Sequence, residues 1–218
     1  MIPPPSPRPP VAAFDVDGTL TTRDCVTPFL REIAGRRLVL RLARHPLALL
    51  GALARRDNDR LKELACSAFA GADGAEVDRR GAAFARHVRA GWMRPDTLAR
   101  LDRHRALGHR VVLVSASLEP YLVPLGALLG ADAVLCTRLE RGPDGRLSGR
   151  LDGPNCRGPE KPARLAAWLT TQGLDDAEVW AYGDSRGDRE LLAAADHPTH
   201  VRGRTIGAEP PPARTLPS

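Results

Sequence analysis

The amino-acid sequence predicts an α/β protein: an open, doubly wound parallel sheet with helices on both faces and a helical bundle inserted after the first strand. Short apolar runs alternate with amphipathic stretches along most of the chain, which is typical of a parallel sheet buried between helices. Residues 25–93 interrupt this alternation with helical periodicity throughout, and they are too many for a crossover connection. We therefore expect one core and one inserted helical cap.

Each element of the core is predicted from its local pattern. Residues 111–114 are a β-branched run typical of a buried strand, and Gly108 ends the helix before it. Pro162 marks the first turn of a later helix, and Gly142-Pro143-Asp144-Gly145 indicates a hairpin-like turn. The expected strands are residues 11–14, 111–114, 133–136, 179–182 and 200–202, and the expected helices are residues 97–107, 121–129, 162–171 and 188–195.

Breaks in the helical pattern divide the cap, and composition marks both ends of the chain. Helix stops fall near Gly35, Pro46, Gly51 and residues 71–74. A proline-rich N-terminus indicates a flexible leader, and a proline-rich C-terminus indicates a disordered tail. The predicted boundaries are residues 1–10 for the leader, 11–24 and 94–206 for the core, 25–93 for the cap and 207–218 for the tail.

Composition limits the classes of partner. The 218 residues include 32 basic and 26 acidic ones, a net charge of +6, and Lys62 and Lys161 are the only lysines. Aromatic residues make up 4% and no stacking motif is present, so we expect no nucleic-acid binding. The four cysteines form no Cys-x-x-Cys pair and the N-terminus lacks an apolar signal core, so we expect free thiols and a cytoplasmic protein.

Two carboxylates follow the first expected strand, at Asp15 and Asp17. Residues two apart on a strand face the same side of a sheet, and Gly18 permits the chain to turn just past the strand end. Both carboxylates can then reach one phosphate group, Asp15 to attack it and Asp17 to protonate the departing oxygen. The alternative is a solvated turn that closes the strand without any chemistry.

Three later segments add groups that a phosphate and a cation need. Ser115 follows a strand expected beside the first, so its hydroxyl and the next backbone N–H groups can bind a phosphate oxygen. Lys161 suits the joint neutralisation of a phosphate and an adjacent aspartate. Asp184 and Asp188 offer carboxylate oxygens, which Mg²⁺ prefers. The alternatives are helix capping for Ser115 and Asp184, and a surface position for Lys161.

These segments resemble the four motifs of the haloacid dehalogenase-like hydrolase superfamily. The matching stretches are Asp15-Val16-Asp17-Gly18-Thr19-Leu20, Ser115, Lys161 and Gly183-Asp184-Ser185-Arg186-Gly187-Asp188. The helical insertion between the first two resembles the cap of the phosphoserine-phosphatase-like branch, subfamily IB. The resemblance covers residues 11–201, and it implies a Rossmann-like core with a cap that closes over the site.

The resemblance also implies a role for each matched residue. Asp15 corresponds to a nucleophile that forms an aspartyl-phosphate, and Asp17 to the general acid and base. The implied substrate-binding residues are Gly18, Thr19, Ser115, Ala116 and Lys161, and the implied Mg²⁺-binding residues are Asp15, Asp17 through its backbone carbonyl, Asp184 and Asp188.

The expected function is that of a Mg²⁺-dependent phosphatase acting on a small phosphate monoester. Phosphoserine is not the expected substrate, because Asp24 and Ala65 stand where phosphoserine phosphatases carry a glutamate and an arginine; Arg60 or Lys62 can replace that arginine. The alternatives are a phosphotransferase, a phosphatase for lysophospholipid or phosphatidylglycerophosphate-type esters at a membrane surface, and a catalytically silent membrane-docking or binding protein.

The cap bears on the membrane alternative. Residues 36–45 and 47–53 combine arginines with a broad apolar stripe, which can lie on an anionic membrane as a peripheral contact. We favour the interpretation that the stripe is buried in the cap's own core while the arginines are solvated.

Overall fold

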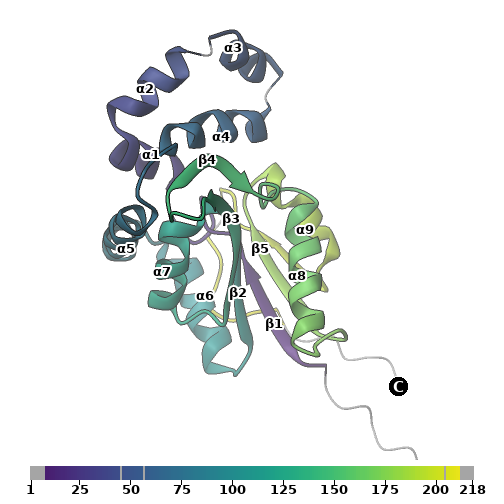
Figure 1. Cartoon of the computed structure of the whole chain (residues 1–218). Coiled ribbons are helices and arrows are strands. Elements are labelled where there is room, and N and C mark those ends of the chain that lie inside the picture. The colour runs from purple at the N-terminus through teal and green to yellow at the C-terminus, as the bar shows by residue number, and fades with distance from the viewer. Residues whose placement is uncertain (1–7, 45, 56, 204, 212–218) are drawn as a thin grey trace, which may run out of the picture.

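A six-stranded sheet forms the centre of the computed structural model, which describes residues 8–211 except 45, 56 and 204 (Figure 1). The strands are β1 (Pro10–Phe14), β2 (Arg110–Leu118), β3 (Ala133–Arg141), β4 (Leu147–Asp152), β5 (Glu178–Gly183) and β6 (His197–His200). Their order is β4-β3-β2-β1-β5-β6, with β4 antiparallel to β3 and the other neighbours parallel. The chain winds outward from β1 in both directions, so the predicted doubly wound fold is confirmed.

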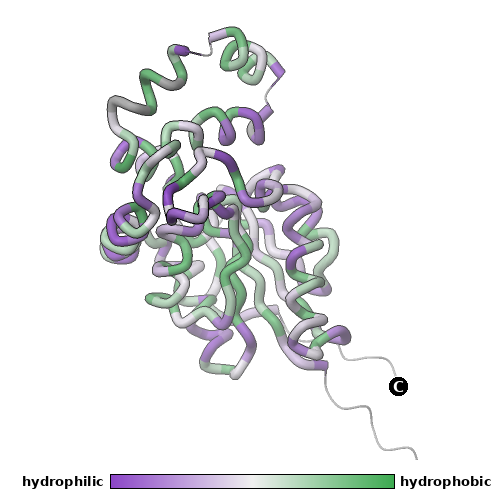
Figure 2. The backbone as a smooth tube through the Cα atoms, viewed as in Figure 1, coloured by the Kyte–Doolittle hydropathy of each residue, from purple (hydrophilic) through white to green (hydrophobic). Residues whose placement is uncertain are grey.

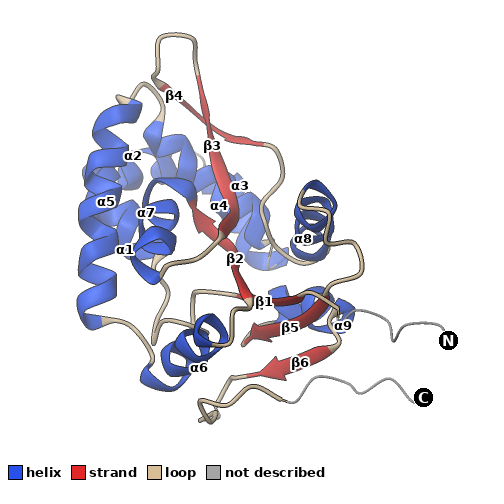
Figure 3. Ribbon diagram, turned by 90° about the horizontal axis from the view of Figure 1, so that it is seen from below, coloured by secondary structure: helices blue, strands red, loops and turns tan. Residues whose placement is uncertain are grey.

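Both faces of this sheet are buried, because alternate residues of each central strand belong to different cores. Ala12 and Phe14 of β1 join the core on one face, and Val11 and Ala13 join the core on the other. Helices α6 and α7 cover the first face, and α8 and α9 cover the second (Figure 3). Their bounds are α6 (Pro95–Ala106), α7 (Glu119–Leu129), α8 (Glu160–Thr171) and α9 (Arg189–Ala194).

Helices fill the stretch of chain between β1 and α6. They are α1 (Val26–Ala34), α2 (Arg36–Ala43), α3 (Pro46–Arg55), α4 (Asn58–Cys66), the 3₁₀ turn η1 (Ser67–Phe69) and α5 (Gly74–Gly91). An isolated β-bridge pairs Thr21 with Met93, so the chain enters and leaves this region at one place. Helix α5 packs closely on α7, where a side chain on Gly81 would collide with the backbone carbonyl of Pro120. The core and cap boundaries remain our proposal.

Several element bounds differ from the sequence expectation. Strand β2 continues past residue 114 to Leu118, so Ser115 lies inside a strand whose pairing with β3 becomes irregular after it. Strand β6 covers His197–His200, because Trp180 of β5 pairs with His197. Gly51 lies inside α3 instead of ending a helix, since helical context outweighs the weak propensity of one glycine.

The predicted leader and tail are described only next to the core. Arg8 forms an ion pair with Asp196 at 3.0 Å, so the leader is held at this point. The Gly207 carbonyl accepts a hydrogen bond from Nε of Arg100 at 2.8 Å. The first residue of the predicted disordered tail is therefore held against the core. Pro10 of the predicted leader is the first residue of β1, whereas residues 1–7, and the tail beyond residue 211, lie outside the described residues. The four cysteines are buried free thiols, as predicted.

His104 of α6 gives the fold a pH dependence. Its ring nitrogens lie 2.8 Å from the Tyr182 hydroxyl and 2.8 Å from His109, and burial lowers the pKa of His104 to about 3. In the unfolded chain His104 has its ordinary pKa of about 6.5, so it binds a proton below that pH, whereas in the folded chain it stays neutral until about pH 3. Stability therefore falls as the pH falls from about 6.5 towards 3.

We expect the free energy of unfolding, measured with urea, to fall by about 2 kcal/mol from neutral pH to about pH 5 through this group. His104→Gln removes the titration, so its stability should change less over the same range. An equal pH dependence in the two proteins would contradict the assignment to His104.

Candidate active site

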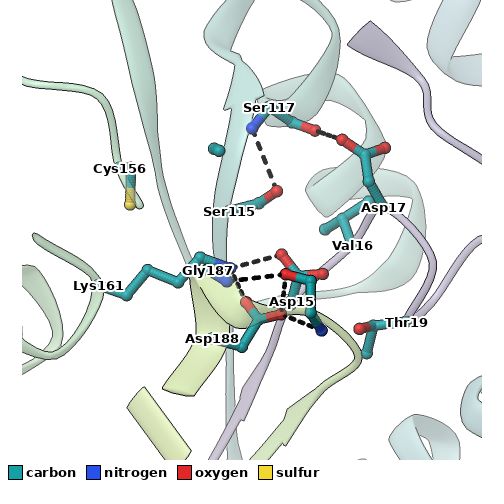
Figure 4. Close-up of polar contacts among 12 residues, drawn as sticks. Asp15, Val16, Asp17, Thr19, Ser115, Ser117, Cys156, Lys161, Gly187 and Asp188 are labelled. Atoms are coloured by element: carbon teal, nitrogen blue, oxygen red, sulfur yellow. Dashed lines mark hydrogen bonds and ion pairs between the residues drawn. The ribbon is translucent and has the colours of Figure 1, made fainter. Parts of the chain in front are cut away.

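The predicted site residues meet at the carboxyl edge of the sheet, where the winding reverses beside β1 (Figure 4). Asp15 directly follows β1, and Asp184 directly follows β5. Ser115 lies in β2 between these strands and β3, and Lys161 lies in the first turn of α8. Segments far apart in the sequence thus contribute to one cluster.

Lys161 is the buried cation of this cluster. Its Nζ lies 2.5 Å from Oδ1 of Asp15 and 2.5 Å from Oδ1 of Asp188. Burial alone would lower the pKa of Lys161, but the two carboxylates outweigh it and raise that pKa. Burial likewise opposes ionisation of Asp188, yet Lys161 and local hydrogen bonds hold its pKa below the usual value. Burial dominates at Asp15 and raises its pKa to about 7, against the attraction of Lys161.

The loop after β5 fixes Asp188. Its Oδ2 accepts hydrogen bonds from the Ser185 backbone N–H at 2.9 Å and from the Ser185 hydroxyl at 2.7 Å. The Ser185 hydroxyl in turn accepts the Gly187 N–H at 3.1 Å, which completes a capping box. Asp188 therefore reaches Lys161 from a rigid turn.

Asp184 lies across the cluster from Lys161, against the first motif. Its half-buried carboxylate accepts a long hydrogen bond, 3.4 Å, from the Thr19 hydroxyl. Gly18 has a φ of +82°, and a Cβ there would lie 2.5 Å from Oδ2 of Asp184. The glycine is therefore needed twice, for its backbone conformation and for the approach of this carboxylate.

Oxygen atoms of Asp15, Asp184 and Asp188 lie within 4.8 Å of one another. Three carboxylates thus lie near one lysine. Burial raises the pKa of Asp184, and the negative charge of the nearby Asp188 raises that pKa further. An all-oxygen donor set with excess negative charge suits a hard divalent cation. The residues present thus fit the expected Mg²⁺. Asp17 contributes no side-chain oxygen to this group.

Asp17 is held separately, with its carboxylate directed toward Ser117 (Figure 4). Oδ2 accepts the Ser117 hydroxyl at 2.6 Å, and Oδ1 accepts the Cys25 backbone N–H at 2.8 Å. Burial raises the pKa of Asp17, although the Ser117 hydrogen bond opposes this. A carboxyl group with a raised pKa can carry a proton to a leaving oxygen.

Ser115 and Ser117 form a pair that sequence reasoning resolved only in part. The buried Ser115 hydroxyl accepts the Ser117 backbone N–H at 3.2 Å, and its own hydrogen can point to a ligand. Ser117, which contacts Asp17, was not predicted. The available signal was its spacing, two residues after Ser115 on the same strand.

Of the three residues considered for substrate recognition, Asp24, Arg60 and Lys62, only Lys62 contacts the backbone next to Ser115. Asp24 caps α1, because its carboxylate accepts the backbone N–H groups of Val26 and Thr27 at 3.0 Å each. Arg60 is exposed and pairs with Glu63 of its own helix. Lys62 reaches from α4 to the carbonyl oxygen of Ala116, next to Ser115.

The model of the haloacid dehalogenase-like hydrolase family matches residues 12–193. The chain belongs to this family. This haloacid dehalogenase-like protein is 40% identical to Protein CicA of Caulobacter vibrioides over 190 residues, covering 87% of this chain and 84% of CicA. The family model identifies it as a haloacid dehalogenase-like hydrolase.

Two solved structures show the same architecture. A Bordetella pertussis protein of unknown function superposes with a TM-score of 0.66 at 25% identity, covering 86% of this chain and 87% of that one. A phosphoserine phosphatase, solved as a phospho-aspartyl intermediate analogue, has a TM-score of 0.59 at 19% identity, covering 87% and 84%. The predicted architecture, a Rossmann-like core with an inserted helical region, is thus confirmed.

Metal binding to the carboxylate cluster is testable without turnover. Adding Mg²⁺ at about 100 times its Kd should stabilise the parent by about 2.7 kcal/mol, seen as a rise in Tm. Asp184→Asn should lose most of this rise, because it removes one anionic ligand. Asp24→Asn, a carboxylate outside the cluster, is the matched control and should keep the rise. A full Mg²⁺ response in Asp184→Asn would remove Asp184 from the metal site.

Proposed function

We propose that this protein is a cytoplasmic, Mg²⁺-dependent phosphatase that hydrolyses a small phosphate monoester through an aspartyl-phosphate. The observation that carries the proposal is the separation of two carboxylates. Burial raises the pKa of both carboxyl groups, but Asp15 contacts the buried Lys161 ammonium, which favours its anionic form, whereas Asp17 is held by the Ser117 hydroxyl instead. One carboxylate is thus placed to attack as an anion and the other to carry a proton.

In the first step, a carboxylate oxygen of Asp15 attacks phosphorus. The new O–P bond forms as the bond to the ester oxygen breaks, and the Asp17 carboxyl gives its proton to that oxygen. Lys161 lies within contact of Asp15 and can neutralise charge on the transferred phosphoryl group. The Ser115 hydroxyl, with the N–H of Ala116, can bind a phosphoryl oxygen.

In the second step, water attacks the phosphorus of the aspartyl-phosphate. The Asp17 carboxylate accepts the proton of that water, the Asp15–phosphorus bond breaks, and inorganic phosphate leaves. Asp15, Asp184 and Asp188 would hold Mg²⁺, which supplies charge neutralisation and orientation of phosphoryl oxygens. Asp17 regains its proton in this step and is ready for the next cycle.

Replacement of Asp15 tests this function. Asp15→Asn keeps an oxygen that can accept the Lys161 hydrogen bond but removes the nucleophile, so phosphate release should fall by at least about 10⁴-fold with the fold intact. The measurement is inorganic phosphate released from a panel of monoesters, with Mg²⁺ or with EDTA. Equal rates in parent and variant would refute the proposal, and transfer to added glycerol instead of water would identify a phosphotransferase.

A second candidate function, on lipid-type phosphate esters at a membrane surface, is favoured by the outer cap. Val39, Leu40, Leu47, Leu50 and Leu53 of α2 and α3 are 53–83% exposed, so the interpretation of a fully buried stripe is wrong here. Figure 2 shows green apolar stretches on these two helices, at the end of the molecule away from the sheet. A monomeric surface rarely exposes so many large apolar side chains together.

The charge around this patch supports an anionic lipid bilayer as its occupant. Residues 33–56 contain six arginines and no acidic residue, and Arg44 and Arg55 are exposed beside the apolar side chains. A second copy of the chain would bring like charges together, whereas anionic headgroups attract them and leucines enter the interface. Within the described residues, no helix is long and apolar enough to cross a bilayer.

Vesicle flotation tests the patch. The parent should float with phosphatidylcholine vesicles containing phosphatidylglycerol and not with phosphatidylcholine alone. Leu47→Glu with Leu50→Glu should reduce binding at least about tenfold, because charged residues cannot enter the interface. Val123→Glu with Leu128→Glu, on exposed positions of α7, is the control. Equal flotation of both double variants would refute the membrane contact while leaving hydrolysis of soluble esters unaffected.

A further inference from the structure

A lysine side chain of the cap is hydrogen-bonded to the backbone of the candidate active site. Lys62 of α4 donates hydrogen bonds to the Ala116 carbonyl oxygen and, at 3.0 Å, to Oδ1 of Asn155. The Asn155 amide group is fixed in turn: Oδ1 also accepts the Thr137 hydroxyl at 2.7 Å, and Nδ2 donates to Asp59 of α4 at 2.6 Å. The ammonium is therefore aimed at one carbonyl by an ordered set of partners.

That carbonyl belongs to the peptide group that joins Ala116 to Ser117. The N–H of the same peptide donates to the Ser115 hydroxyl at 3.2 Å, and the Ser117 hydroxyl donates to Asp17 at 2.6 Å. One peptide group thus contacts Lys62 through its carbonyl and the Ser115 hydroxyl through its N–H, and it carries the Ser117 side chain that binds Asp17. A shift of this peptide group would move the hydroxyl that orients Asp17.

We propose that Lys62 is a positioning residue: from the cap, it fixes the Ala116–Ser117 peptide and thereby holds Ser115 and the Ser117–Asp17 pair in working geometry. The role rests on the proposed phosphatase function. Burial of Lys62 lowers its pKa, and its described contacts are neutral oxygens, so the ammonium is oriented by hydrogen bonds without a carboxylate in ion-pair contact. The contact exists only while α4 lies over the sheet edge, so the site is complete only with the cap in place.

Backbone hydrogen exchange tests the contact without turnover. In Lys62→Met, exchange of the Ser117 amide should accelerate by about tenfold relative to the parent, because the peptide loses its charged partner. The matched control is Arg60→Met, which removes a cation from the exposed face of the same helix and should leave this amide unchanged. Unchanged exchange in Lys62→Met would overturn the proposal whatever its activity, and leaves the phosphatase assignment standing.

Leaving-group dependence tests the consequence for catalysis. Asp17 must protonate the oxygen of an alkyl phosphate, whereas p-nitrophenolate leaves without a proton, so kcat/KM of Lys62→Met should fall by about 10²-fold for the alkyl ester and much less for p-nitrophenyl phosphate. Lys62→Arg should recover most of the loss, since a guanidinium can donate to the same carbonyl. Equal losses for both esters, or no rescue by arginine, would reduce Lys62 to a packing role and refute the proposal.

Discussion

The contact of one buried ammonium with two carboxylates sets the geometry of the whole site. Lys161 joins the first turn of α8 to Asp15 at the end of β1 and to Asp188 after β5, so three segments from both halves of the sheet are fixed by one cation. In a buried triad of this kind, loss of one partner leaves uncompensated charge that costs on the order of 3–5 kcal/mol. The same arrangement keeps an excess of negative charge at Asp184, so the protein core itself favours a cation at this edge.

The two acidic residues of the first motif differ in environment because the chain turns between them. Asp15 belongs to the Lys161 cluster, and Asp17 is held by the Ser117 hydroxyl and the Cys25 backbone N–H. Cys25 immediately precedes α1, so the start of the cap contributes to the environment of Asp17. Core and cap thus both shape this carboxyl group, although the sheet alone places its backbone.

The sequence predicts best what depends on local pattern. The doubly wound sheet and the convergence of Asp15, Lys161, Asp184 and Asp188 follow from polar residues placed after apolar strands or near the start of the next helix. Ser117 and the Lys62–Asn155 contact could not be predicted, because they depend on a strand that runs past its apolar segment and on how α4 packs over the sheet edge. The exposure of the α3 leucines could not be predicted for the same reason, because periodicity identifies an apolar face but not what covers it.

The bridge between Thr21 and Met93 has a consequence for how the chain folds. Strands β1 and β2 are neighbours in the sheet, yet Val11 pairs with Arg110 across the whole insertion. Closing so long a loop as random coil carries an entropic cost that grows with its length, and distant pairings slow folding. Helices that form early within the insertion shorten this loop, and the bridge brings its ends together. Helix formation within the insertion therefore offsets part of the closure cost that the insertion itself imposes on the sheet.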